Sequence, residues 1–225
     1  MRYFNLTYPY AESLWADHNK ESVERLRIPC ALHAEHLGES RRIGPLNLEV
    51  KHNRRDEMMI WTWSDGVHER ILEGFQKEGY TGYRLKPAIV RFRDGLISNE
   101  YYELVVTGWA GVVSPESGMQ LKKTCTACHY QLFTAITDYS KMIDWSQWTG
   151  DDFFFVYPFL GRILCTERVA EWLRSNQVKS FRLEEGFAER ARDPIISKLE
   201  MTAGKLSNVM PDDIARKYSK VLGLE

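Results

Sequence analysis

The chain has 225 residues, 44% of them hydrophobic and 27% charged, and its 30 Lys and Arg nearly balance its 31 Asp and Glu. This composition is typical of a folded globular protein and excludes a largely disordered chain. The formal net charge of −1 offers no excess of cations to a phosphate backbone, so we expect no nucleic-acid partner.

The chain is also expected to have no membrane partner and to be cytoplasmic. No apolar run reaches the roughly 18 residues that a membrane-spanning helix needs. The first residues, MRYFNLTYPYAESLW, lack the basic start, apolar stretch and cleavage site of a secretory signal.

The first clear elements are a helix followed by a strand. Apolar residues in 68–78 recur at helical spacing, Gly79 suits the end of a helix, and 83–92 is rich in β-branched and aromatic residues. The turn residues Arg93-Asp94-Gly95 then lead to a second strand over 101–113, which we expect to pair antiparallel with the first.

Later elements are a strand, a helix and a helical tail. Residues 152–164 are strongly apolar, and Pro158 within them predicts an edge strand or a bent one. Residues 211–222 have the pattern of a helix that begins at a proline, and 194–206 form a weaker helix candidate.

An internal similarity at an offset of 98 residues relates the segment 68–85 to the segment 166–183. Both segments have helical spacing first and strand spacing afterwards, so each predicts a helix, a turn and a strand. Duplication and convergence on one packing solution both explain the similarity. The identical pairs are Glu69/Glu167, Arg70/Arg168, Glu73/Glu171, Arg84/Arg182 and Leu85/Leu183.

Together these elements predict an α+β fold, mainly an antiparallel sheet packed by helices, with two similar helix-turn-strand units. No linker divides the sequence, so we expect one compact domain over 1–225. Within it, two similar halves lie around 60–115 and 150–185, and 186–225 form a helical extension at the carboxyl end.

Three of the four cysteines suggest a metal site. Cys30 and His33 form a CxxH, and Cys125 and Cys128 form a CxxC. Two such pairs supply the four ligands of a tetrahedral structural zinc site, with His36 and His129 as further candidates. Two small buried cysteines and a surface histidine are the alternative interpretation.

The same residues carry a resemblance to a known family. The start MRYFNL, the Asn19-Lys20 pair and Pro29-Cys30, followed by the second CxxC and the segment 162–169, resemble the bacterial double-CXXCG motif family over roughly residues 1–185. Both CxxC glycines and one thiol of the family motif are replaced here, by Ala34, His129 and His33. Histidine in place of cysteine keeps zinc binding chemically possible.

The resemblance implies an immunity protein that binds and neutralises a cognate toxin by direct protein–protein contact. Such a protein needs an exposed patch with aromatic residues and a polar rim, and no catalytic residue. Trp145 and Trp148, beside Asp151 and Asp152, are the candidate partner-binding residues.

Two other function classes were weighed against the immunity role. A zinc-stabilised nucleic-acid-binding or scaffold protein would share the metal site, but the first predicts a basic surface, which the balanced charge opposes. A Cys/His enzyme is disfavoured because no GxSxG, HExxH or phosphate-binding loop occurs in the sequence. We therefore expect a protein that is not an enzyme.

Overall fold

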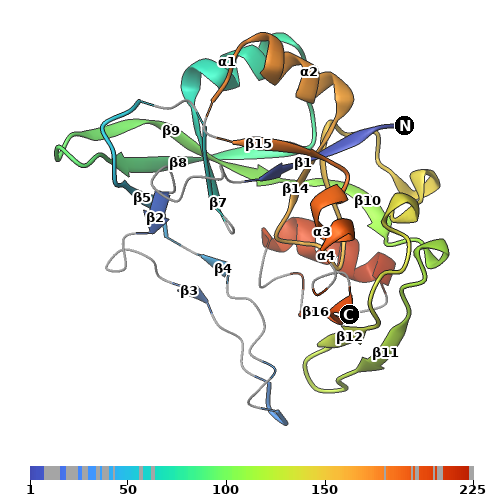
Figure 1. Ribbon diagram of the computed structural model, residues 1–225. Coiled ribbons are helices and arrows are strands. Elements are labelled where there is room, and N and C mark those ends of the chain that lie inside the picture. The colour runs from blue at the N-terminus through green and yellow to red at the C-terminus, as the bar shows by residue number, and fades with distance from the viewer. Residues whose placement is uncertain are drawn as a thin grey trace.

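Helices in the computed structural model pack against sheets whose strand pairs are mostly antiparallel, which confirms the predicted α+β class (Figure 1). None of the described helices has the length and apolar character needed to cross a lipid bilayer. The predicted motif residues Asn19, Lys20, Pro29 and Ala34 lie outside the described residues. The structure describes residues 1–7, 16–18, 25–26, 30–33, 36, 41–42, 44–55, 58–61, 64–179, 181–193, 195, 198–204, 206 and 210–222.

A six-stranded sheet contains the first predicted hairpin. Strands β8 and β9 pair antiparallel, with Leu85 opposite Leu104, as the turn residues between them predict. In order across the sheet the strands are β2 (Ala16–His18), β5 (Leu46–Val50), β8 (Tyr83–Arg91), β9 (Ile97–Val106), β7 (Ser64–His68) and β6 (Met58–Trp61).

A five-stranded sheet contains the apolar segment around Pro158. Strand β13 (Phe153–Tyr157) is internal to this sheet and buried along its whole length, so of the two predicted alternatives the edge strand is wrong. The reason is that Pro158 comes directly after the strand, in the turn to β14, where it removes no hydrogen bond from the sheet. The order is β10 (Gly108–Val112), β13 (Phe153–Tyr157), β14 (Ile163–Thr166), β1 (Tyr3–Thr7) and β15 (Arg182–Glu185).

The segment 101–113, predicted as one strand, crosses from one sheet to the other. Strand β9 ends at Val106 in the six-stranded sheet, and β10 begins at Gly108 in the five-stranded sheet. A Cβ at Gly108 would overlap the carbonyl oxygen of Phe153. The absence of a side chain there lets the chain pass close to β13 and change sheets.

Each of the two similar segments contributes a strand, a helix and a second strand that runs parallel to the first. In each sheet a third strand lies between these two and runs antiparallel to both. In the first unit, β9 lies between β7 and β8, and helix α1 (Glu69–Lys77) connects β7 to β8. In the second unit, β1 lies between β14 and β15, and helix α2 (Glu167–Ser175) connects β14 to β15. The helices begin and end at residues related by the offset of 98, which confirms the two predicted helix-turn-strand units.

The same offset also relates the two inserted strands. Leu104 of β9 lies opposite Leu85, and Leu6 of β1 lies opposite Leu183, so the strand registers agree in both units. If the chain is divided near residue 98, the first strand of each half lies in the sheet of the other half. A correspondence that extends over strands, helix and register favours duplication over convergence.

Helices α1 and α2 pack side by side over one end of the sheets (Figure 1). Gly74 of α1 is related by the offset to Trp172 of α2, and a Cβ at Gly74 would overlap the Trp172 ring. The Trp172 ring also meets Phe75 edge-on at 5.4 Å. Glycine in α1 therefore provides the space for the largest side chain of α2.

The carboxyl-terminal residues pack against the five-stranded sheet. Helix α4 (Asp212–Leu222) confirms the predicted terminal helix, and its Tyr218 ring stacks on Trp109 of β10 at 4.5 Å. The weaker helix predicted over 194–206 is wrong in the part of it that the structure describes, where β16 (Met201–Ala203) pairs with β12. A short helix α3 (Ala188–Arg192) precedes it.

The remaining elements are short. A three-stranded sheet has the order β11 (Leu121–Thr124), β12 (Gln131–Phe133) and β16, and β3 (Arg25–Leu26) pairs with β4 (Arg41–Arg42). Single turns of 3-10 helix lie at η2 (Pro115–Ser117), η3 (Tyr139–Lys141) and η4 (Trp145–Gln147).

Candidate metal centre

Four Cys and His side chains from two distant parts of the chain meet at one place. One ligand atom from each of Cys30, His36, Cys125 and Cys128 lies within 4.8 Å of every other. Residues 30 and 125 are 95 positions apart, yet their sulfurs are 3.8 Å apart. The predicted meeting of the first Cys segment with the CxxC is therefore confirmed.

The CxxC occupies the turn of a β-hairpin. Strands β11 and β12 pair antiparallel with Thr124 opposite Gln131, and Cys125 comes directly after the first strand. The Cys125 amide donates to the Tyr130 carbonyl at 2.8 Å. The His129 amide donates to the Cys125 carbonyl at 2.9 Å, which closes the turn that carries both thiols.

His129 adopts a backbone conformation that favours glycine. Its φ is +56°, in the left-handed region, which side chains other than glycine adopt at a cost of about 1 kcal/mol. The replacement of glycine therefore does not prevent the turn. His129 itself is not among the four clustered ligands.

The first Cys segment supplies Cys30 and His36. The Leu32 amide points at the Cys30 sulfur at 3.4 Å, as in many metal-binding turns. The His36 amide donates to the His33 carbonyl at 3.2 Å, and this turn brings the His36 ring to the hairpin. There it stacks on the Tyr130 ring at 4.4 Å.

The structure thus brings together Cys30, Cys125 and Cys128 of the expected ligand set, with His36 in place of His33. The His33 ring lies against the His36 ring at 4.6 Å, next to the centre. The sequence made His36 only a further candidate, because Cys30 and His33 have the CxxH spacing of a tight metal-binding turn. Cys30 and His36 are separated by five residues and do not have that spacing.

All six distances among the four ligand atoms are 4.8 Å or less, and two of them match the distances in a tetrahedral zinc site. With Zn–S near 2.3 Å and Zn–N near 2.0 Å, tetrahedral geometry places two sulfurs about 3.8 Å apart and a sulfur and a nitrogen about 3.6 Å apart. The Cys30 and Cys125 sulfurs are 3.8 Å apart, and the Cys128 sulfur is 3.6 Å from His36 Nδ1. Three thiols and one imidazole are also the donor types that zinc prefers.

The electrostatics of the CxxC favour one thiolate before any metal binds. Amide N–H groups of Cys128 and Ala127 lower the pKa of the Cys125 thiol to about 6. Burial raises the pKa of the Cys128 thiol to about 11, and the neighbouring thiols of Cys30 and Cys125 act in the same direction. A bound divalent cation supplies the positive charge that lets all three thiols ionise together.

The four residues expected to bind a partner are largely used inside the fold. Trp145 and Trp148 are half-buried, and Trp145 packs edge-on against Tyr3 at 5.8 Å. The Trp148 indole N–H donates to the Asp151 carbonyl at 3.0 Å.

Asp152 connects the two helix-containing units. It is 7% exposed and accepts hydrogen bonds from the Thr166 hydroxyl at 3.0 Å and the Thr81 amide at 3.1 Å. It also forms an ion pair with Arg168 at 2.8 Å. A buried carboxylate with these partners stabilises the fold and is not available to another protein.

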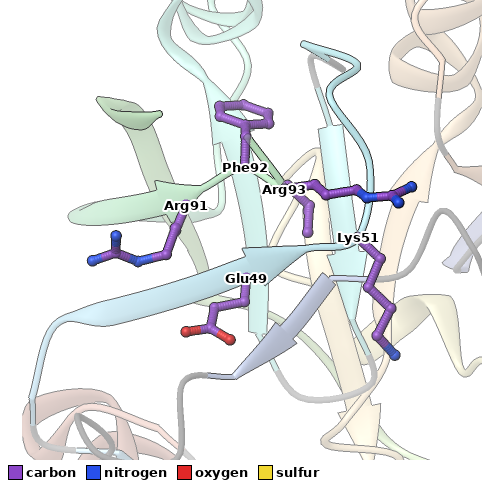
Figure 2. A pocket seen from close by; sticks show the side chains of 6 residues that line it. Glu49, Lys51, Arg91, Phe92 and Arg93 are labelled. Carbon is purple, nitrogen blue, oxygen red and sulfur yellow. The ribbon is translucent and has the colours of Figure 1, made fainter. Parts of the chain in front are cut away.

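A shallow hollow of about 480 Å³ lies at the end of β5 and β8 (Figure 2). Its charged lining consists of Lys51, Arg91, Arg93 and Glu49, and the lining contains no Cys, Ser or His. Sequence reasoning missed this surface, because its cations come from two segments about 40 residues apart and neither has a net charge that stands out alone.

Comparison of the chain with models of known protein families gives no match, and comparison with curated proteins gives none. The resemblance to the double-CXXCG family therefore depends only on the motif residues of this sequence.

Proposed function

We propose that this protein is a binding protein stabilised by one structural zinc ion, and that it acts as an immunity protein that neutralises a toxin by direct contact. The ion would be held by Cys30, His36, Cys125 and Cys128. When bound, zinc would supply a tetrahedral cross-link between the 30–36 segment and the β11–β12 hairpin.

The observation that carries this proposal is the closed set of four protein donors. Catalytic zinc sites keep a coordination position for water or substrate, whereas four protein ligands fill the tetrahedron. Among residues 30–33 and 36, none is buried, so the described part of this segment contributes little to a hydrophobic core. A metal cross-link is therefore the natural means of holding it.

The hollow at the end of β5 and β8 supports binding rather than catalysis. Its lining has one carboxylate and three cations, and it lacks a nucleophile beside a base. The lowered pKa of Cys125 beside His36 is a feature that would suit a Cys/His enzyme. The same feature suits a metal ligand, and two further thiols at the same place favour the metal.

Four free cysteines suit a reducing compartment, so we place the protein's action in the cytoplasm of the producing cell. There it would meet a toxin made by that cell or delivered by a neighbouring one.

Coexpression tests the proposed role. The protein is produced with the product of the adjacent gene, and survival of the cells is compared with survival when that product is expressed alone. We expect protection together with a complex that elutes as one peak in gel filtration. Absence of protection, or protection by a variant that no longer binds the product, would reject neutralisation by direct contact.

A further inference from the structure

The outer face of the six-stranded sheet carries a compact group of cations beside exposed isoleucines. We call it the β5–β8 face. Side chains alternate along each strand, so Val50, Val90 and Phe92 point to the core, while their neighbours point outward. The outward residues of the face are Glu49, Lys51, Ile89, Arg91, Arg93 and Ile97.

Strand register places these residues side by side. Arg91 lies between Glu49 of β5 and Ile97 of β9, which are its partners in the two neighbouring strands. Lys51 and Arg93 follow at the ends of β5 and β8, where their side chains border the hollow (Figure 2). Neither Arg91 nor Arg93 forms an ion pair with a residue that the structure describes.

The lining of the hollow is basic although the chain is not. Three cations and one carboxylate surround a hollow of about 480 Å³ in a protein whose formal net charge is −1. Arginine forms paired hydrogen bonds with carboxylates and is enriched where protein interfaces gain most of their affinity. The charge of the face therefore complements an acidic surface.

The loop behind the face is fixed in place. Arg55 forms an ion pair with Asp94 at 3.1 Å, and its guanidinium stacks on the buried Phe92 ring at 3.9 Å. These contacts join the loop after β5 to the turn after β8. The cations of the face therefore project from a preorganised support, which reduces the entropy lost on binding.

We propose that the β5–β8 face is the docking site for an acidic surface of the partner toxin, an inference that rests on the proposed immunity function. The partner presents carboxylates to Arg91 and Arg93 and an apolar side chain to the isoleucines. Ile89 and Ile97 are 36% and 46% exposed, so an interface would remove them from water.

A protein partner fits this face better than a nucleic acid does. Glu49 lies beside Arg91 and would repel a phosphate. Exposed isoleucines gain nothing from a sugar-phosphate backbone, and three cations are few for a duplex.

The test uses two charge-reversed variants of the full chain. Arg91→Glu/Arg93→Glu changes the face, and Arg192→Glu/Arg216→Glu makes the same charge change on exposed positions of α3 and α4. Binding of each purified protein to the adjacent gene product is measured by calorimetry. Circular dichroism and melting temperature show whether each variant is folded.

We expect the first variant to bind about 100-fold more weakly than the wild type, and the control to stay within about threefold of it. Raising the salt from about 0.05 M to about 0.5 M should weaken wild-type binding more than that of the first variant.

Each other outcome has a definite meaning. If the wild type binds and both variants bind equally well, the docking site is wrong and the immunity function stands. If the wild type does not bind the product, the proposed function fails and the docking site fails with it. If a short DNA duplex binds the wild type but not the first variant, and both proteins bind the toxin equally well, the face is a nucleic-acid site.

Discussion

His33 and His36 provide a matched pair of substitutions that tests the metal centre. Both are half-buried on the same short segment, and their rings are 4.6 Å apart. His36 Nδ1 lies 3.6 Å from the Cys128 sulfur and His36 is one of the four clustered ligands, whereas His33 is not among them. His36→Ala therefore removes a ligand, whereas His33→Ala removes an equal ring beside it and leaves all four donors in place.

The size of the effect follows from the number of ligands. Structural zinc contributes about 10–16 kcal/mol in small zinc-binding peptides at neutral pH. One ligand of four then corresponds to about 2.5–4 kcal/mol, so His36→Ala should weaken zinc binding roughly 100- to 1000-fold. His33→Ala should change it less than about threefold.

Stability should respond in the same way. A metal that joins residues 95 positions apart closes a long loop, and a cross-link of that length stabilises a fold by up to about 4.7 kcal/mol. In a chain of 225 residues, each kcal/mol corresponds to about 2–4 °C in Tm. Loss of the ion should therefore lower Tm by roughly 10–20 °C.

Zinc per chain is measured by mass spectrometry on protein purified under reducing conditions without chelators, affinity by competition with a colorimetric chelator, and Tm by calorimetry. Zinc retained at wild-type affinity in His36→Ala would refute the ligand assignment. Loss of zinc in His33→Ala together with retention of zinc in His36→Ala would instead support the CxxH ligand set first expected from the sequence. A wild-type protein without zinc would refute the metal centre itself.

Three further predictions concern the same fold. Although alanine favours helices, Gly74→Ala should destabilise the protein by about 1–3 kcal/mol in urea unfolding, because the added Cβ would overlap the Trp172 ring. In a protein that also carries Trp172→Leu, most of this loss of stability should disappear. His129→Gly should stabilise it by about 1 kcal/mol in the same assay, since glycine adopts the positive φ without strain, and a loss of stability would contradict the conformation of the turn. Because zinc ligands must be deprotonated, the affinity for zinc should fall as pH falls, and it should fall more steeply below the Cys125 pKa of about 6. Zinc release that does not depend on pH would contradict thiolate ligation.

The helix-turn-strand units could be predicted from the sequence because each depends on local periodicity. Ile71 and Phe75 of α1 and Val169 and Leu173 of α2 are all fully buried, as helical spacing indicates. Gly79 and Gln177 both adopt positive φ at the ends of these helices, where a left-handed residue was expected.

Other features depend on contacts that sequence spacing does not report. The break between β9 and β10 depends on the approach of Gly108 to the Phe153 backbone, which lies about 45 residues further along the chain. The position of His36 depends on a turn at His33 and on the Tyr130 ring of a distant hairpin. Asp152 has the sequence context of a surface turn, and its internal position depends on its contacts with Thr81 and Arg168, which the spacing of the sequence does not report.

The metal centre and the exchanged strands connect the same two halves of the chain. The offset of 98 residues that relates α1 to α2 also relates Cys30 to Cys128, so each half supplies one of these two related cysteines to the shared centre. Strand β1 completes the sheet of the second half, and β9 completes that of the first. Neither half therefore has all the strands of its own unit or a full set of metal ligands. In a duplicated chain of this kind, zinc would reinforce an association that strand exchange already requires.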